Sequence, residues 1–324
     1  MEQKELFIEA IRSSLIQSFI QVNRSEYRGI KEWFAKKEYT PDKYGNGKLF
    51  LTVTNPEKLV GALSSDCKRF SMAAFESIHS LLEYKKESKT TSWIVVKSYY
   101  SAFYGAHATL RMFGKSCTNF NQDQIDELKE VCKLYSINLP KNFTSGPYIF
   151  SFNYDLKVLS IEKAQDQKGG SHVFMWKEYT NLIEGLAEKV IQTSESGGVI
   201  YAPVSKQLKK LAEILKMRKG NGSSLSEIRN QVSYEHLYGS WFPHIGASKK
   251  TIQQIKSAIA IYKVKGLNYD ISAEKPANEL MQVMISSQFI CAICFGILKD
   301  INDLNEKSIH KSGIIQLLNS VKIK

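Results

Sequence analysis

Residues 93–111, WIVVKSYYSAFYGAHATLR, decide the fold class of this chain. The stretch combines tryptophan, tyrosine and phenylalanine with alanine and other small residues over about five helical turns. It predicts a long core helix over residues 91–113, ended by Gly114, because a residue without a Cβ suits a helix end. The remaining elements are expected to pack around it.

Outward from this helix, most of the chain has helical periodicity. Residues 48–54 have the composition of a short strand, 39–47 are expected to be a loop, and the aromatic stretch around 148–154 predicts a small β insertion or hairpin near 140–170. The fold class is therefore mainly α, a helical bundle with minor β structure. The other predicted helices span 3–20, 25–37, from Pro56 to about 84, 121–135 with Asn121 as cap, 172–192, 203–218, 248–265, 276–300 and 308–321.

Length and charge limit the number of domains and the kinds of partner that this chain can have. The chain has 324 residues, 43% of them hydrophobic, which suffices for one large or two small domains. Its net charge is +12, and residues 201–265 hold twelve Lys and Arg against three Asp and Glu. This concentration favours a surface for a polyanion, with a solvated basic face as the alternative.

The cysteines and apolar stretches indicate a cytoplasmic protein without a membrane span. Five unevenly spaced cysteines do not suggest a disulfide framework, and no signal peptide is recognisable. Cys291 and Cys294 lie in an apolar run and are expected to be buried small side chains. The stretch 281–298 has an uninterrupted apolar run of ten residues, which suits a core or interface helix better than a membrane span.

A second informative stretch is SLSEIRNQVSYEHLYG, residues 224–239. Ser224 and Glu227 have the spacing of a capping box, and Gly239 is placed to end the helix. In an α-helix, Arg229 and His236 would share one stripe, offset by roughly 20° and about 10 Å apart in rise. A guanidinium and an imidazole on one stripe suit a phosphate group and a proton transfer.

The pattern Arg229-Asn230, followed by five residues and His236, resembles the motif of the HEPN family of ribonucleases in its long form. The aromatic helix at 93–111 is similar to a core helix found early in many HEPN domains. The resemblance covers residues 58–242 with the insertion near 140–170. It leaves 1–57 and 243–324 as N-terminal and C-terminal helical extensions.

The resemblance implies an endoribonuclease that needs no metal or other cofactor. The ribose 2′-OH would attack the adjacent phosphorus, His236 would act as general base or acid, and Arg229 would hold the phosphate. Asn230 would orient the histidine or a backbone group. The family also implies a homodimer with facing motif helices, and a toxin or anti-phage effector of the abortive-infection kind with an antitoxin or regulatory partner protein.

Further residues near the motif are candidates for contacts with RNA. Tyr234 and Tyr238 flank His236, and Tyr238 resembles a tyrosine that is modified in some HEPN toxins; the alternative is an aromatic residue that packs the helix end. Trp241 and His244 suit base stacking, or equally the return of the chain to the core. The remaining substrate-binding candidates are the basic Lys209 and Lys210 of helix 203–218.

Two other functions remain open. A non-catalytic HEPN-like module could bind RNA or a protein through the basic face. An all-α scaffold or regulatory subunit could dock a partner through 281–298. His79, His107 and His172 are expected to be structural, His172 as an ordinary helix start.

Overall fold

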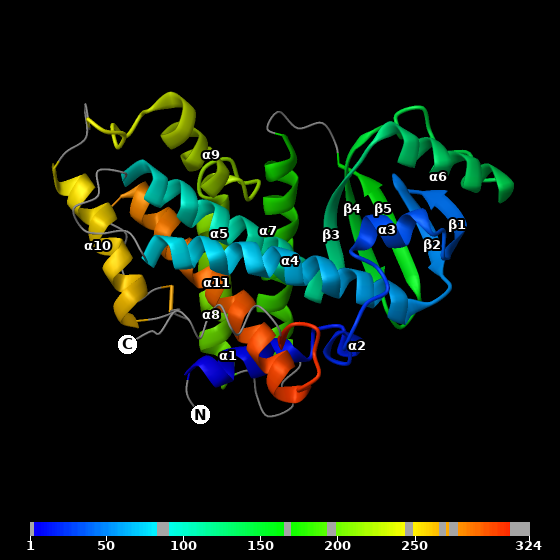
Figure 1. Cartoon of the computed structure of the whole chain (residues 1–324), viewed down its shortest axis with the longest axis horizontal. Coiled ribbons are helices and arrows are strands. Elements are labelled where there is room, and N and C mark those ends of the chain that lie inside the picture. The colour runs from blue at the N-terminus through cyan, green and yellow to red at the C-terminus, as the bar shows by residue number, and fades with distance from the viewer. Residues whose placement is uncertain are drawn as a thin grey trace.

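The computed structural model describes residues 3–82, 91–164, 170–192, 199–243, 249–265, 270–271 and 278–311. Within these ranges, helices fill most of the molecule and a five-stranded antiparallel sheet forms one end (Figure 1). The prediction of a mainly α protein with a small β part is therefore confirmed.

A central layer of three long helices carries the core. It consists of α4 (Pro56–Leu82), α5 (Thr91–Met112) and α11 (Glu279–Leu304), with α5 packed against both of the others. α5 is buried along almost its whole length, as its aromatic and small residues predict. At Gly105 a Cβ would lie 3.6 Å from the Cys291 Sγ, an ordinary van der Waals distance, so α5 and α11 are in direct contact there.

α11 is long and apolar enough to cross a membrane by length and composition, but 83% of its most apolar window is buried in the protein. Cys291 and Cys294 lie in this helix and are fully buried. Their prediction as buried small side chains is confirmed, and burial raises the pKa of Cys291 to about 12. α11 is thus a core helix of the described structure.

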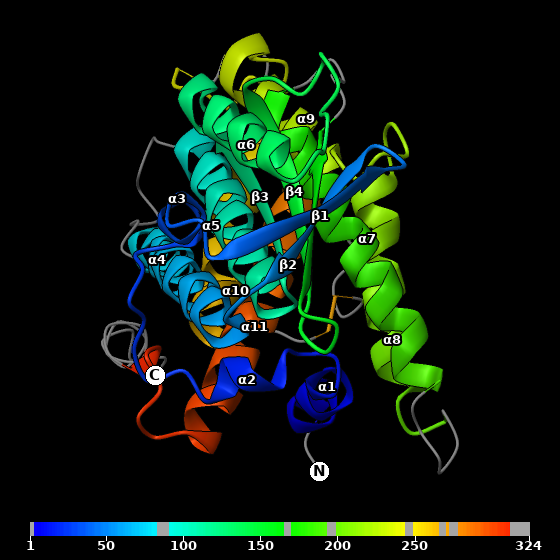
Figure 2. The same ribbon diagram turned by 90° about the vertical axis from the view of Figure 1, so that its right-hand side faces the viewer.

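The remaining helices surround this layer. α7 packs along α8, and this pair crosses the direction of α4 and α5 (Figure 1). α1 and α2 lie near one another at the bottom of the turned view in Figure 2. The helices that surround the central layer are α1 (Gln3–Arg12), α2 (Gln17–Ile20), α3 (Ile30–Ala35), α6 (Gln122–Leu134), α7 (Gly170–Gln192), α8 (Ala202–Lys216), α9 (Ser224–Asn230) and α10 (Lys249–Lys265).

The sheet joins two distant parts of the chain. Its order is β1-β2-β5-β4-β3, and each neighbouring pair is antiparallel. The N-terminal hairpin β1–β2 pairs through β2 with β5, so it shares one sheet with the hairpin β4–β5. The strands are β1 (Tyr39–Gly45), β2 (Lys48–Val53), β3 (Lys115–Phe120), β4 (Gly146–Asn153) and β5 (Val158–Lys163).

One face of the sheet is covered by α3 and α6. Phe34 of α3 contacts Tyr39, Phe120 and Phe150 from three different strands. Alternate residues of β2, β4 and β5 are buried, as expected for a sheet with one covered face. The predicted strand at 48–54 and hairpin near 140–170 are confirmed.

Some local predictions were wrong. The expected loop at 39–47 is mostly strand β1, because Asn46 and Gly47 both adopt positive φ and make a tight hairpin turn. Pro41 fits there because β1 is an edge strand with a register shift just after it. The predicted helix 3–20 is interrupted at 13–16, and the predicted helix 25–37 forms only over α3. The predicted helix 308–321 lies mostly outside the described residues.

Candidate functional site at the end of helix α9

The segment that carries the Arg–His pattern is not one α-helix. α9 continues at Gln231 into a π-helical turn, η1 (Gln231–Glu235), which ends at His236 in the left-handed conformation, with φ 54°. A π-helix bonds i to i+5 and so turns less per residue than an α-helix. The predicted stripe shared by Arg229 and His236 is therefore not formed, and the two side chains have different surroundings.

The start of α9 also differs from the expectation. The residue before the helix is Ser223, whose Oγ donates to Glu227 Oε1 at 2.7 Å. Ser224 Oγ instead accepts a hydrogen bond from the Arg218 backbone N–H at 3.0 Å. The predicted capping box of Ser224 with Glu227 is not formed, because the N-cap residue is Ser223, and its side chain bonds to the Glu227 carboxylate and not to a backbone N–H of the first turn.

Arg229 is enclosed by aromatic rings. Its side chain is 7% exposed, and its guanidinium carbon lies 5.1 Å and 5.6 Å from the ring centroids of Tyr99 and Tyr100 on α5. Its Nη1 donates to the Tyr234 hydroxyl at 3.4 Å, and its Nε has no hydrogen-bond partner among the described residues. Cation–π contacts thus hold a charge that is incompletely hydrogen-bonded.

A histidine that the sequence did not single out lies next to this cluster. The Tyr99 hydroxyl accepts a hydrogen bond from Trp176 Nε1 at 3.0 Å, so its own proton is available for His172 Nδ1 at 2.7 Å. The His172 ring stacks on Phe103 at 4.2 Å. Burial, with a smaller contribution from the positive charge of Arg229, lowers the pKa of His172 to about 4. His172 therefore does not only begin a helix, as expected, but also contacts Tyr99 and Phe103 of α5. The sequence signal that could have indicated this is its i,i+4 spacing to Trp176, which places both side chains on one face of α7.

His236 lies on the outside of the same region. It is exposed, and its ring stacks on Trp241 with the centroids 5.8 Å apart. Trp241 is half-buried, and its Nε1 donates to the Val232 carbonyl of η1 at 2.7 Å. Trp93 meets the same ring edge-on at 5.5 Å. Trp241 therefore fixes the chain that follows η1 against η1 and α5, and one face of its ring stacks on His236.

Three exposed apolar residues lie within six positions of His236 in the chain, and a fourth, Trp93, contacts its stacking partner Trp241. Trp93 is 48% exposed, Tyr234 74%, Leu237 62% and Phe242 58%. We call these four residues the helix-end patch. Scattered exposed apolar residues are common, but four beside one helix end are typical of a contact surface for another molecule.

Tyr238 belongs to an ion network rather than to the open surface. Its hydroxyl donates to Glu279 Oε2 at 2.5 Å, and Arg218 contacts the same carboxylate through Nε and Nη2. Arg218 Nη1 also donates to Gln231 Oε1 at 2.6 Å. Burial, with the Glu279 hydrogen bond as a further cause, raises the pKa of Tyr238 to about 12. The network fixes η1 to the first turn of α11.

The other candidates contribute less to this cluster. Asn230 is half-buried at the junction of α9 and η1, and His244 lies outside the described residues. Lys209 and Lys210 are exposed on α8, where Lys210 pairs with Glu213 at 3.2 Å. Other cations of the basic region are paired too: Lys216 with Glu184, Arg218 with Glu279 and Lys219 with Glu227.

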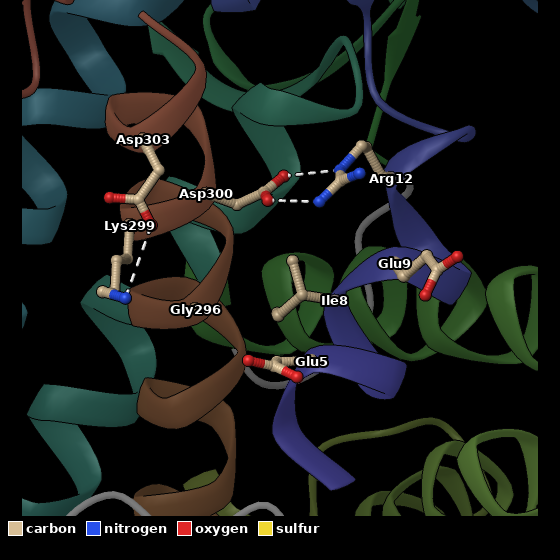
Figure 3. A pocket seen from close by; sticks show the side chains of 8 residues that line it. All are labelled: Glu5, Ile8, Glu9, Arg12, Gly296, Lys299, Asp300 and Asp303. Atoms are coloured by element: carbon tan, nitrogen blue, oxygen red, sulfur yellow. Dashed lines mark hydrogen bonds and ion pairs between the residues drawn. The ribbon is translucent and has the colours of Figure 1, made fainter. Parts of the chain in front are cut away.

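A separate hollow of about 350 Å³ lies between α1 and α11 (Figure 3). Arg12 reaches across it to Asp300 in a two-point contact, with distances of 2.8 Å and 2.5 Å. Lys299 pairs with Asp303 at 3.4 Å. The Arg12–Asp300 ion pair joins α1 to α11, and Glu5 and Glu9 also line the hollow.

Among the residues that the structure describes, no three His, Cys, Asp or Glu side chains are grouped as metal ligands. Comparisons with models of protein families, with curated proteins and with solved structures found no match.

Two histidines with lowered pKa values make acid sensitivity an expected property. His172 titrates near pH 4 in the folded protein but near 6.5 when unfolded, and burial also lowers the pKa of His310, to about 3. The unfolded chain therefore binds protons first, and the free energy of unfolding should fall as the pH drops from about 6.5 to about 4. Urea denaturation across this range would measure it.

The variant His172→Gln provides the control for that experiment. Glutamine keeps a hydrogen-bond acceptor for the Tyr99 hydroxyl but has no titrating ring. Its free energy of unfolding should fall less than that of the parent protein over the same pH interval. An equal fall in both proteins would show that His172 is not a source of the acid sensitivity.

Proposed function

We propose that the chain is a metal-independent endoribonuclease of the HEPN type that acts as a homodimer. One observation carries the proposal. Arg229 is buried, its Nε has no hydrogen-bond partner among the described residues, its Nη1 contacts Tyr234, and the same helical segment ends at the exposed His236. π-helical turns such as η1 are frequent at functional sites.

The proposed reaction is an in-line transfer at phosphorus. The 2′-oxygen of a ribose forms a bond to the adjacent phosphorus while the bond to the 5′-oxygen of the next nucleotide breaks. His236 of one copy takes the proton from the 2′-OH or returns a proton to the leaving 5′-oxygen. Arg229 stabilises the charge that develops on the phosphate oxygens. The products are a 2′,3′-cyclic phosphate and a 5′-hydroxyl.

Movement of Tyr234 would give the substrate access to Arg229. The Tyr234 ring is 74% exposed, and its only hydrogen bond to Arg229 is long, at 3.4 Å. Rotation of an exposed tyrosine about its Cα–Cβ bond is fast compared with turnover. The hydroxyl can therefore be replaced by a phosphate oxygen, while Tyr99 and Tyr100 keep the guanidinium in place.

The helix-end patch supports the dimer. The exposed residues of the patch in one copy would be covered by the same residues of a second copy, as in a two-fold interface. Asn230, Trp241, Lys209, Lys210 and His244 remain candidates for positioning the RNA. In a cytoplasmic toxin or anti-phage effector, a partner protein would restrain the nuclease by competing with the second copy for this same patch.

A second function is favoured by the burial of Arg229. Three tyrosine rings surround its guanidinium, which is also the environment of an arginine with a structural role. A non-catalytic module that binds RNA or a protein through the basic face of residues 201–265 would then be the outcome. Such a module would bind RNA in a salt-sensitive manner without forming products.

Incubation of the purified chain with transfer RNA and messenger RNA, with and without EDTA, tests the proposal. We expect fragments in both reactions, with 2′,3′-cyclic phosphate and 5′-hydroxyl ends. Those ends are the signature of attack by the 2′-OH. Cleavage that stops in EDTA, or fragments with 5′-phosphate ends, would contradict the mechanism, and binding without fragments would favour the second function.

A further inference from the structure

A basic pocket lies at the other end of α5, away from the Arg229 cluster. It has a volume of about 510 Å³ and is formed where the segment before α3 meets α4, the end of α5 and strand β3. Four cationic side chains line it, against a single carboxylate, Asp66. They are Arg28, Lys31, Arg69 and Arg111.

Arg111 lies on the buried side of this pocket, and its guanidinium is incompletely hydrogen-bonded. Its side chain is 2% exposed, and its Nε has no hydrogen-bond partner among the described residues. The nearest carboxylate oxygen, Asp66 Oδ2, is 3.6 Å from that Nε. Nη1 donates to the His107 carbonyl at 2.8 Å, and Phe70 lies 4.3 Å below the guanidinium. A buried charge without full compensation is unfavourable, and an anion in the pocket would relieve it.

Asp66 does not neutralise the pocket, because it is shared. One of its oxygens pairs with Arg69, and the other faces the Ile30 backbone N–H at 3.4 Å as well as Arg111. Gly29 makes this approach possible, since a Cβ on it would lie 2.1 Å from Asp66 Oδ1. Arg28 and Lys31 are exposed and have no ion pair within the described part of the chain. The pocket therefore keeps an excess of positive charge.

We propose that this pocket binds a small phosphate-bearing molecule, a phosphate monoester of about mononucleotide size. Guanidinium groups match phosphate oxygens with paired hydrogen bonds, and three arginines from three different segments converge here. The volume exceeds what a bare phosphate ion needs. A phosphate would lie between the exposed Arg28 and Arg69, with Arg111 supplying the buried charge behind it.

Isothermal titration calorimetry on the full chain tests the site with four probes: AMP, inorganic phosphate, adenosine and a single-stranded RNA oligonucleotide without terminal phosphates. We expect AMP and phosphate to bind and adenosine not to bind. Tighter binding of AMP identifies an organic phosphate as the ligand, and equal binding identifies free phosphate. Binding of adenosine as tight as that of AMP would overturn the proposal, as would displacement of AMP by the oligonucleotide, which would identify RNA as the occupant.

Variants at exposed positions locate the binding without endangering the fold. Arg28→Ala and Arg69→Ala should each weaken AMP binding about three- to tenfold, since each removes a charged hydrogen-bond donor. Arg24→Ala is the matched control, because Arg24 is an exposed arginine of the same N-terminal segment that does not line the pocket. Unchanged affinity in both pocket variants, or equal loss in the control, would overturn the assignment.

Discussion

The variants Arg229→Lys and His236→Ala should each lower RNA cleavage by about two to four orders of magnitude. Lysine keeps the positive charge beneath the tyrosine rings but loses the paired donors that fit a phosphate. His236 is exposed, so alanine removes a proton-transfer group without opening the core. Glu235→Ala, at the exposed neighbouring position, is the control and should retain activity.

A mixed dimer of the two inactive variants provides the sharper form of this experiment. In a composite site, Arg229 of one copy works with His236 of the other. The heterodimer then has one site with both substitutions and one site with neither, and should recover about half of the parent activity per dimer. Co-expression with two different affinity tags would isolate it.

An inactive heterodimer would show that Arg229 and His236 act within one copy or not at all. A stable monomer with full activity in sedimentation would likewise contradict the dimer. Activity that both single substitutions leave unchanged would remove these residues from the mechanism and leave the helix-end patch as a binding surface.

The largest effect on stability is expected for Trp176→Ala. Trp176 is fully buried, packs edge-on against Tyr179 and donates its indole N–H to the Tyr99 hydroxyl. Removal of so large a buried side chain should lower the free energy of unfolding by about 3–5 kcal/mol. Because a folded domain has only about 5–15 kcal/mol in total, the variant should lose a large share of its stability.

Two comparisons separate the causes of that loss. Trp176→Phe keeps an aromatic ring but removes the hydrogen bond, and should cost less than the alanine variant. Trp93→Ala removes the same side chain from a position that is 48% exposed, where a loss of no more than about 1 kcal/mol is expected. Equal losses at the two tryptophans in urea denaturation would contradict the role assigned to Trp176.

The helices with strong local signals could be predicted from the sequence. α5 follows from its aromatic and small residues, α4 begins at Pro56, and α6 begins at Asn121 with a complete capping box to Gln124. Each of these signals lies within a few residues of the element that it predicts. Local information was therefore sufficient for them.

Strand β3 shows why other elements could not be predicted. Its inward positions Ser116 and Thr118 are polar, so the alternation of apolar residues that indicates a strand is missing. The two hydroxyls bond to each other at 2.9 Å, which makes their burial tolerable. Only the tertiary structure supplies that partner.

Only part of the candidate site could be predicted, because the rest depends on tertiary contacts. The sequence led to Arg229 and His236 because they are close along the chain. It gave no indication that Tyr99 and His172, from two other helices, meet beside Arg229. Nor could apolar periodicity reveal η1, since a single π-turn of five residues is too short to show a period of its own.

The π-turn η1 also changes how residue spacing translates into distance. A turn closed by i to i+5 bonds holds one residue more than a turn closed by i to i+4 bonds. The six residues between Arg229 and His236 are therefore equivalent to about five in an uninterrupted α-helix. A π-turn can accommodate one additional residue locally, so that the end of the helix keeps its position against α5 and α11. Two chains with different Arg-to-His spacings can in this way present the same pair of groups, so a count of intervening residues is a poor measure of relatedness between such sites.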